Sequence, residues 1–412
     1  MRIFLVARGS QGDIYPYIAL AKALVDRSHK VTLNLPKVFE ELAKASGVPY
    51  TLQGQDDIGG MMQNELDTKA LLDWTRRVID NQFTELMPLL REHDIMLASN
   101  TEFAAPSIAE YLKKPFLRTA YGPFIPSRVI PPPVFPWPVA NPVFKPALLW
   151  ALLNGGLNFM VKKTLNRCRA ALNMPPITDQ AEHAPANAFN YLIYSPALGS
   201  VDPAWPYKWA IGGYIFNDDI PYDNDAYRNF IDFVQKDGKK TVFFTLGSCN
   251  SKERERFAEK LFAVCAALRY KLVIGSGWHR LGASLPRHDD LFLLDSPVPH
   301  NLVFPHCSAI IHHGGVGTTH SAARSGKPQM IQPLFLDQWY WAERTRELGA
   351  GPGKANLKRI SREQLKEKVA RLASDEGYAQ NAALLGERIR AENGLANICK
   401  HIEGTKPARP SF

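Results

Sequence analysis

The residues best suited to chemistry lie in a glycine-rich stretch of the second half of the chain. The stretch reads His312-His-Gly-Gly-Val-Gly-Thr-Thr319 and follows an apolar run. Glycines let backbone N–H groups approach an anion, and the N-terminus of a following helix adds free N–H groups and a favourable dipole. The pattern is neither G-x-x-x-x-G-K-[ST] nor G-x-G-x-x-G, which disfavours an ATPase or an ordinary dinucleotide site. It predicts a pyrophosphate site, although a tight strand-to-helix turn with buried histidines has the same pattern.

A carboxylate and a carboxamide stand side by side shortly afterwards, at Asp337 and Gln338. They follow the predicted strand Gln329–Gln332, so they should lie at the carboxyl edge of the same sheet, where ligands bind in open α/β folds. Such a pair can accept hydrogen bonds from sugar hydroxyls and donate to them. Asp337 could equally be the N-cap of the next helix, and one residue can fill both roles.

A second candidate loop follows the first predicted strand and reads Gly9-Ser-Gln-Gly-Asp13. Taken alone this pattern has two interpretations. Asp13 either caps the helix that begins near Pro16 or is a functional carboxylate at the end of a strand.

Two sets of alternating strands and helices must position these loops. In the first half the predicted strands are Arg2–Ala7, Lys30–Leu35, Asp94–Ser99 and Phe116–Tyr121. In the second half they are Thr241–Leu246, Lys271–Ile274, Leu291–Leu294, Ala309–His312 and Gln329–Gln332. Strands that alternate with helices indicate parallel, doubly wound sheets. We therefore predict an N-terminal domain over 1–211, a linker over 212–240, a second domain over 241–390 and a tail over 391–412 that can pack back on the first domain.

Composition supports a two-domain globular protein. The chain has 412 residues, of which 45% are hydrophobic and 22% are charged, which excludes a disordered, collagen-like or disulfide-scaffold protein. Its five cysteines form no C-x-x-C pair, which fits a reducing cytoplasm. The D-x-D string Asp223–Asp225 lies in the predicted linker and not after a strand, so we interpret it as solvated surface and expect no metal site.

The net charge of +9 is concentrated in one segment. Residues Tyr111–Thr178 hold 12 of the 31 prolines, many aromatic residues and nine Lys or Arg, but no Asp or Glu. Such a segment suits a hydrophobic acceptor, or contact with a membrane surface. A loop and a helix beside the interdomain cleft with merely solvated cations would have the same composition.

The second half resembles a known family. The run Val298-Pro-His-Asn-Leu-Val-Phe-Pro, the HHGGVGTT stretch and Phe335-Leu-Asp-Gln-Trp-Tyr-Trp-Ala342 resemble the donor-binding signature of nucleotide-sugar glycosyltransferases with the GT-B fold. The resemblance favours the branch with sterol glucosyltransferases, the rhamnolipid rhamnosyltransferase and the glycopeptide-antibiotic glycosyltransferases. It implies two Rossmann-like doubly wound domains that face each other across a cleft.

The resemblance also implies roles for individual residues. The donor diphosphate would contact His313, Gly315, Gly317 and Thr318, and the transferred sugar would contact Asp337 and Gln338. The nucleotide base of the donor would contact Val298 and Trp278. In the first loop the resemblance makes Asp13 the catalytic base and Ser10 a phosphate contact, and Ser248 of Thr245-Leu-Gly-Ser248 would be another.

These observations predict an inverting glycosyltransferase that moves a hexose from a UDP-sugar, or a dTDP-sugar, to a hydroxyl of a hydrophobic small molecule or lipid. We expect it to be metal-independent, to need no cofactor, to bind no nucleic acid and to act in the cytoplasm, with peripheral contact to the inner membrane surface as an option. Two alternatives stay open: a nucleotide-sugar epimerase or isomerase on the same fold, and a non-catalytic membrane-associated binding module.

Overall fold

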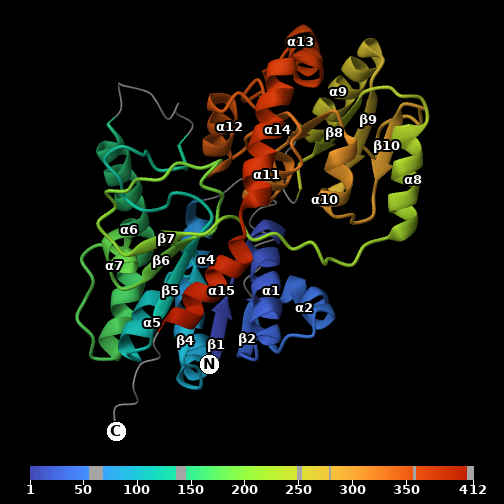
Figure 1. Cartoon of the computed structure of the whole chain (residues 1–412). Helices are drawn as coiled ribbons and strands as arrows, with labels where there is room; N and C mark the ends of the chain where they lie inside the picture. Colours follow the sequence, from blue (N-terminus) through green and yellow to red (C-terminus); the bar gives the residue numbers. More distant parts are fainter. Residues whose placement is uncertain (55–67, 136–144, 248–252, 278–279, 356–358, 406–412) are drawn as a thin grey trace.

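The chain folds into two α/β units, each built on a parallel β-sheet, which Figure 1 shows one above the other. The computed structural model describes residues 1–54, 68–135, 145–247, 253–277, 280–355 and 359–405. Within them no helix combines the length and the apolar character needed to cross a membrane. The two parallel sheets confirm the predicted doubly wound α/β class.

The lower unit in Figure 1 holds a seven-stranded sheet with the strand order β3-β2-β1-β4-β5-β6-β7. Its strands are β1 (Arg2–Val6), β2 (Lys30–Pro36), β3 (Tyr50–Gln53), β4 (Ile95–Ser99), β5 (Phe116–Ala120), β6 (Phe189–Leu192) and β7 (Trp209–Ile211). Every neighbouring pair is parallel. Parallel strands need crossover helices, which cover both faces of the sheet.

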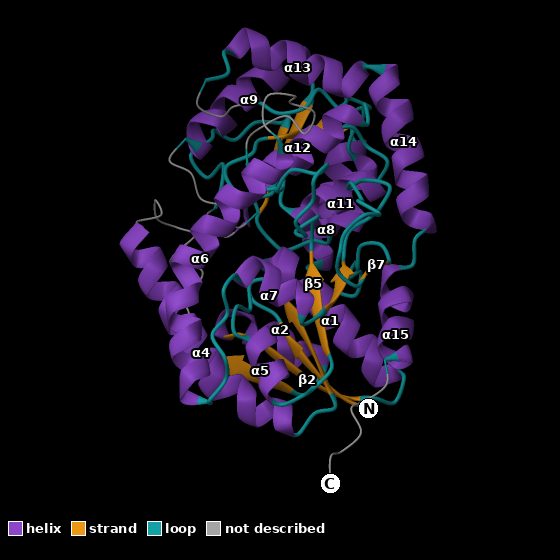
Figure 2. Ribbon diagram, turned by 90° about the vertical axis from the view of Figure 1, so that its left-hand side faces the viewer, coloured by secondary structure: helices purple, strands orange, loops and turns teal. Residues whose placement is uncertain are grey.

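The helices of this unit are α1 (Gln11–Asp26), η1 (Lys37–Phe39), α2 (Glu40–Ser46), α4 (Thr68–Arg91), α5 (Ala105–Tyr111), α6 (Pro146–Ala171) and α7 (Gln180–Ala186). Alternate residues of β1 point to opposite faces. Ile3 and Leu5 pack with α1 and α2 in one core, and Phe4 and Val6 pack with α4, α5 and α6 in another. Figure 2 shows α4 and α5 on one side of the lower unit and α1 on the other.

The upper unit holds a five-stranded parallel sheet with the order β10-β9-β8-β11-β12. Its strands are β8 (Thr241–Thr245), β9 (Lys271–Gly275), β10 (Leu291–Leu294), β11 (Ala309–His312) and β12 (Gln329–Ile331). Its helices are α8 (Asn224–Gln235), α9 (Arg254–Leu268), α10 (His300–Val303), η3 (Phe304–His306), α11 (Val316–Arg324), α12 (Gln338–Glu347), α13 (Arg362–Ser374) and α14 (Glu376–Ala391). Again the core divides between the two faces, with α9 and α13 on one and α8 and α10 on the other.

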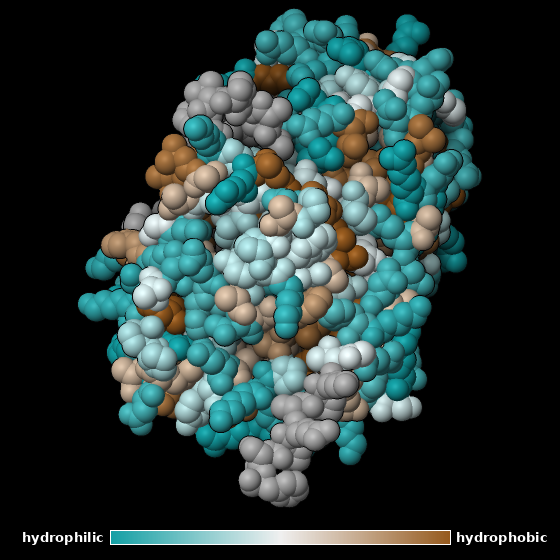
Figure 3. Space-filling view, turned by 60° about the vertical axis from the view of Figure 1, so that its left-hand side comes forward, coloured by the Kyte–Doolittle hydropathy of each residue, from teal (hydrophilic) through white to brown (hydrophobic). Residues whose placement is uncertain are grey.

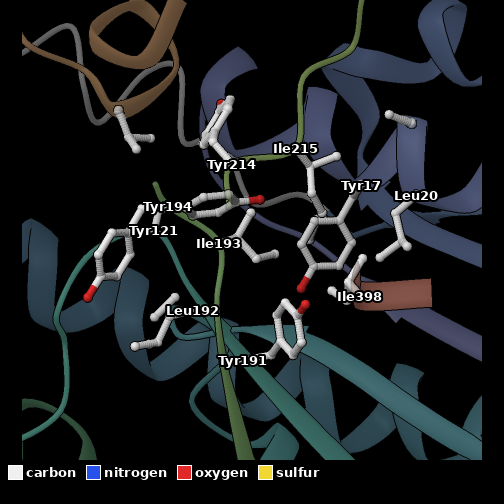
Figure 4. Close-up of a cluster of buried hydrophobic side chains, with 14 of the residues drawn as sticks. Tyr17, Leu20, Tyr121, Tyr191, Leu192, Ile193, Tyr194, Tyr214, Ile215 and Ile398 are labelled. Atoms are coloured by element: carbon white, nitrogen blue, oxygen red, sulfur yellow. The ribbon is translucent and has the colours of Figure 1, made fainter. Parts of the chain in front are cut away.

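The last helix, α15 (Gly394–Gly404), returns to the lower unit and lies beside α1 in Figure 1. Its Ile398, Cys399 and Ile402 belong to the same buried core as α1. Figure 4 shows Ile398 close to Tyr17 of α1, at the place where β6 and the segment after β7 also contribute buried side chains. The end of the chain therefore ties the upper unit to the lower one.

The structure differs from the sequence-based expectation in two places. Strands β3, β6 and β7 were not predicted, although they extend the first sheet at both edges. The segment expected to be an irregular linker contains helix α8, whose Phe230 and Val234 pack on the five-stranded sheet. The string Asp223–Asp225 is exposed, as predicted, and Asp223 also caps α8: its side chain accepts from the N–H groups of Asp225 and Ala226, at 2.9 and 3.0 Å.

Candidate functional site

Both sheets reverse their strand order next to a loop singled out by the sequence. In the first sheet the reversal lies between β1 and β4, and β1 runs into the loop that contains Gly9 and Asp13. In the second sheet it lies between β8 and β11, and β11 runs into the glycine-rich loop. Ligands of open α/β sheets bind outside the carboxyl ends of the strands at such switch points. The fold therefore directs both candidate loops to ligand-binding positions.

Asp13 lies in the first turn of α1 with its carboxylate held by Ser10. Its Oδ2 accepts hydrogen bonds from the Ser10 N–H at 2.8 Å and from Ser10 Oγ at 3.2 Å. Burial raises the pKa of Asp13 to about 6, and the two hydrogen bonds from Ser10 offset part of that effect. A carboxylate of this basicity can accept a proton near neutral pH.

The conformation of Gly9 is what leaves room for this carboxylate. Gly9 has φ +138°, a backbone conformation that essentially only glycine adopts. A Cβ at this position would lie 2.2 Å from Asp13 Oδ2. The glycine and the aspartate of the motif are thus coupled sterically.

Two tyrosines from distant parts of the chain support the same loop. Tyr121, which follows β5, donates its hydroxyl to the carbonyl of Asp13 at 2.6 Å. Tyr214, which follows β7, donates to the carbonyl of Gly12 at 3.4 Å. Figure 4 shows both rings in the buried cluster between the two units. These contacts fix the backbone on which the Asp13 side chain is carried.

The glycine-rich loop of the upper unit meets the first loop directly. A Cβ built at Gly317 would lie 3.4 Å from the Cα of Gly12 and 3.1 Å from the Tyr214 hydroxyl. Gly317 stands in the first turn of α11, and Gly315 is the N-cap of that helix. The N-termini of α1 and α11, each a favourable environment for negative charge, therefore face each other across the boundary between the units.

His313 lies between two glycines at this boundary. A Cβ at Gly247 would come within 2.8 Å of His313 Cε1, and a Cβ at Gly315 would come within 2.4 Å of Nε2. The ring is buried and its Nδ1 has no hydrogen-bond partner among the described residues. Burial, with smaller effects of His312 and His300, lowers the pKa of His313 to about 3, so the imidazole is neutral. A buried imidazole nitrogen without a partner is suited to a ligand's hydrogen bond.

The neighbouring His312 is occupied within the protein. Its Nε2 lies 2.8 Å from Gln329 Oε1, and its Nδ1 accepts from the Gly314 N–H at 3.1 Å. Both ring nitrogens are used, so His312 shapes the turn and His313 is the histidine left to meet a ligand. Thr318, the other predicted phosphate contact with a side chain in this loop, is buried in the first turn of α11.

Asp337 and Gln338 stand at the start of α12. Asp337 occupies the N-cap position, but its Oδ2 accepts from Trp341 Nε1 at 2.8 Å and not from the helix backbone. Burial raises the pKa of Asp337 to about 7, and the charge of Asp13 adds to the increase. Gln338 is buried, and its Oε1 accepts from the N–H groups of Leu334 and Phe335, at 2.7 and 3.2 Å, which closes the loop before α12.

The remaining predicted contacts are more scattered. Val298 follows β10 and packs at the edge of the core around α8 and α10. Ser248 and Trp278 lie outside the described residues. Within the described part of the chain, no group of three or more His, Cys, Asp or Glu side chains is arranged to hold a metal ion.

Sequence reasoning missed several residues that position this site. Trp341 is four residues after Asp337 on a helix, a spacing that would have suggested the contact. Tyr121 and Tyr214 come from distant segments, and nothing in the local sequence indicated them. Gly247 lies within the Thr245-Leu-Gly-Ser248 motif, but its closeness to His313 could not be read from that motif.

Family models match the segments of the chain that contain the two loops. The glycosyltransferase family 28 N-terminal domain matches residues 3–131, and the C-terminal domain of the erythromycin biosynthesis protein CIII-like family matches residues 283–404. The crystal structure of the kitacinnamycin glycosyltransferase superposes with a TM-score of 0.72 at 20% identity, over 98% of both chains. The chain has the GT-B glycosyltransferase fold.

Relatives of this chain come from eukaryotes and bacteria. It is 27% identical to a sterol 3-beta-glucosyltransferase of Yarrowia lipolytica and 25% identical to one of Arabidopsis thaliana, over 98% and 97% of the chain. It spans only 28% and 65% of those two longer proteins. It is also 28% identical to the O-mycaminosyltylonolide 6-deoxyallosyltransferase of Streptomyces fradiae, over 98% of the chain and 97% of that protein.

A further structure of this glycosyltransferase fold contains a nucleotide. The spinosyn rhamnosyltransferase complexed with thymidine diphosphate superposes with a TM-score of 0.65 at 17% identity, over 98% of this chain and all of that one.

Proposed function

We propose that the chain transfers a hexose from a UDP- or dTDP-sugar to a hydroxyl of a hydrophobic acceptor, with inversion at the anomeric carbon. The observation that carries this proposal is the meeting of two loops at Gly12 and Gly317. It sets a carboxylate of raised pKa, Asp13, opposite a helix N-terminus and a buried, unpartnered imidazole nitrogen, that of His313.

Asp13 is the proposed general base. It takes the proton of the acceptor hydroxyl as the oxygen attacks the anomeric carbon, while the bond to the diphosphate breaks. General-base assistance of this kind contributes about 10²- to 10⁴-fold to the rate. The hydrogen bonds from Ser10 hold the carboxylate in place, which makes Ser10 a positioning residue as well as a proposed phosphate contact.

The leaving diphosphate is the proposed ligand of the α11 loop. Backbone N–H groups of Gly315 and Gly317, the Thr318 hydroxyl and the His313 imidazole would donate to its oxygens as negative charge develops. His313 is neutral, so it would act as a hydrogen-bond donor and not as a cation. Because this cradle consists of backbone and side-chain donors, we expect transfer to continue in the presence of EDTA.

The sugar is the proposed ligand of the α12 N-terminus, and the acceptor is a sterol-like or macrolide-like alcohol. Asp337 has one carboxylate oxygen bonded to Trp341 and the other available for a sugar hydroxyl within the described contacts. The named activities of the relatives support hydrophobic acceptors, sterols in one group and a macrolide in the other. The thymidine diphosphate complex of the rhamnosyltransferase supports dTDP-sugars beside UDP-sugars as donors.

The test is a donor and acceptor panel with the full-length chain. UDP- and dTDP-hexoses are incubated with a sterol and a macrolide aglycone, and nucleoside diphosphate release is measured together with the mass of the product. Asp13→Asn should abolish most of the transfer, whereas Asp26→Asn, at the exposed far end of the same helix, should not change it. An epimerase would convert the donor sugar without acceptor or diphosphate release, and a binding module would bind no nucleotide sugar.

A further inference from the structure

Helix α6 exposes a line of large apolar side chains to solvent. Leu148, Leu152 and Phe159 are 54%, 60% and 71% exposed. They are spaced by four and seven residues, so they lie on one face of the helix. Gly155 and Gly156, between them, face open space, since a Cβ at either would meet nothing within 4 Å. We call Leu148, Leu152 and Phe159 the apolar stripe.

The opposite face of α6 is already buried in the lower unit. Leu149, Trp150, Val161 and Leu165 are all at most 6% exposed. The first half of the helix is thus apolar on both sides, and packing within the chain accounts for only one of them. An exposed apolar face of this kind is a feature of surfaces that bind a partner or a membrane.

Lysines stand at both ends of the stripe on the same face. Lys145, the N-cap of α6, precedes Leu148 by three residues, and Lys163 follows Phe159 by four. Both are exposed. The face from Lys145 to Lys163 is about 27 Å long at the rise of an α-helix. Apolar side chains with flanking lysines are typical of helices that lie in the plane of a lipid interface.

The segment 128–130, which precedes α6, also has exposed side chains. Trp150 Nε1 donates to the carbonyl of Ile130 at 2.8 Å, which places residues 128–130 against the helix. In this segment Val129 is 67% exposed and its neighbour Arg128 is also exposed. This segment therefore adds one exposed apolar side chain and one exposed cation to the surface of the same unit.

Several cations of the segment 111–178 already have partners within the chain. Arg118 is held inside the lower unit beside Asn190, Arg169 pairs with Glu110 at 2.8 Å, and Arg167 pairs with Asp80. By contrast the side chains of Lys145, Lys163 and Arg128 form no ion pair or hydrogen bond with a described residue.

The elements packed against α6 add little negative charge. The segment 111–178 contains no carboxylate. On the adjoining helix α4, Asp73 pairs with Arg76, Asp80 pairs with Arg167 and Glu85 accepts from the Gly54 N–H. On α7, which also packs on α6, Asp179 caps the helix and Glu182 is exposed. The charge around the stripe is therefore positive, which favours an anionic surface and disfavours pairing with a second copy of the same positive face.

We propose that this face of α6 rests on an anionic lipid bilayer, with the apolar stripe in the headgroup–acyl boundary and Lys145 and Lys163 on lipid phosphates. Figure 1 places α6 at the left margin of the molecule, away from α8 and β10 at the right. Figure 3 shows the surface with this side brought forward, where brown hydrophobic patches are set among teal side chains. The inference gives the proposed function a source of acceptor: a hydroxylated hydrophobic molecule taken from the membrane.

The test is flotation of the full-length chain with vesicles of phosphatidylcholine, with and without phosphatidylglycerol. The chain should float with the anionic vesicles and lose this binding as salt is raised. The variant Leu148→Ser/Leu152→Ser/Phe159→Ser should bind at least about tenfold more weakly, because three side chains no longer enter the interface. Lys145→Gln/Lys163→Gln should lose the preference for anionic vesicles.

A matched control is Leu384→Ser, because Leu384 on α14 is 54% exposed, like Leu148, but lies in the upper unit. It should float like the unchanged chain. The proposal is overturned if the unchanged chain does not float, if the triple variant floats equally well, or if the stripe variants change only the oligomeric state in sedimentation. Vesicle binding needs no turnover, so a failure of the proposed transferase activity would show separately.

Discussion

The substitution Gly9→Ala tests the proposed role of Asp13 without changing any ionisable group. The new Cβ would lie 2.2 Å from Asp13 Oδ2, 2.5 Å from its Cγ and 2.8 Å from its Cβ, so the aspartate side chain must turn away. The carboxylate then leaves the N–H and hydroxyl of Ser10 that now hold it. Backbone strain at φ +138° adds about 1–3 kcal/mol of destabilisation.

The expected kinetic result is a loss of kcat with little change in donor affinity. A misplaced general base forfeits a contribution of about 10²- to 10⁴-fold, so kcat should fall by at least about 10²-fold. Nucleoside diphosphate binding, measured by calorimetry, should change by less than about threefold, because all of the proposed diphosphate contacts of the α11 loop are untouched and only Ser10 lies beside the substitution. The assay is steady-state release of the nucleoside diphosphate with and without acceptor.

The control is Gly47→Ala at the end of α2. Gly47 also has a positive φ, +70°, but a Cβ there would meet nothing within 4 Å. This variant shares the backbone strain without the contact to Asp13, so it should lose stability and keep its kcat. If Gly9→Ala and Gly47→Ala have the same kcat, the carboxylate of Asp13 does not act in the reaction as proposed.

Three further predictions follow from the site and its support. In the unchanged chain kcat/KM should rise with pH through about 6 as Asp13 ionises, and Asp13→Asn should lose this limb together with about 10²- to 10⁴-fold of the rate, as a pH–rate profile would show. Burial raises the pKa of Asp337 from 3.8 to about 7, so the folded chain holds this proton more tightly than the unfolded chain and loses stability as pH rises from about 4 to 7; the melting temperature of Asp337→Asn, which does not ionise, should fall less than that of the unchanged chain over this range. Glu102→Gln removes the buried partner of Arg8 and should cost about 3–5 kcal/mol in denaturant unfolding, whereas Glu41→Gln, from the exposed pair with Lys44, should leave stability unchanged.

The central strands of both sheets were predictable because they are buried on both faces and appear as continuous apolar runs. The outer strands β3, β6 and β7 of the first sheet were not, since runs such as Tyr50–Gln53 and Phe189–Leu192 mix polar and apolar residues and owe their conformation to a neighbouring strand. Helix α8 has the Phe230–Val234 spacing and an aspartate N-cap. Because the segment is polar and lies between two predicted domains, it was interpreted as a linker in spite of this spacing.

The residues of the candidate site also divide into those that the sequence could predict and those that it could not. The loop residues could be predicted because each follows a predicted strand within a recognisable motif, and the structure brings Gly12 and Gly317 together as a shared ligand site would require. Their supports could not be predicted, because Tyr121 and Tyr214 reach Asp13 and Gly12 from 108 and 202 residues away. Contacts of this range depend on the packing of whole elements and leave no trace in local sequence.

The most direct test of the central claim is the anomeric configuration of the product formed by the unchanged chain from an α-linked UDP- or dTDP-hexose and a hydrophobic alcohol. One base at Asp13, opposite a diphosphate at the α11 loop, predicts a β-linked product in NMR spectra, with one nucleoside diphosphate released for each glycoside. An α-linked product, or release of the diphosphate without any glycoside, would contradict the account.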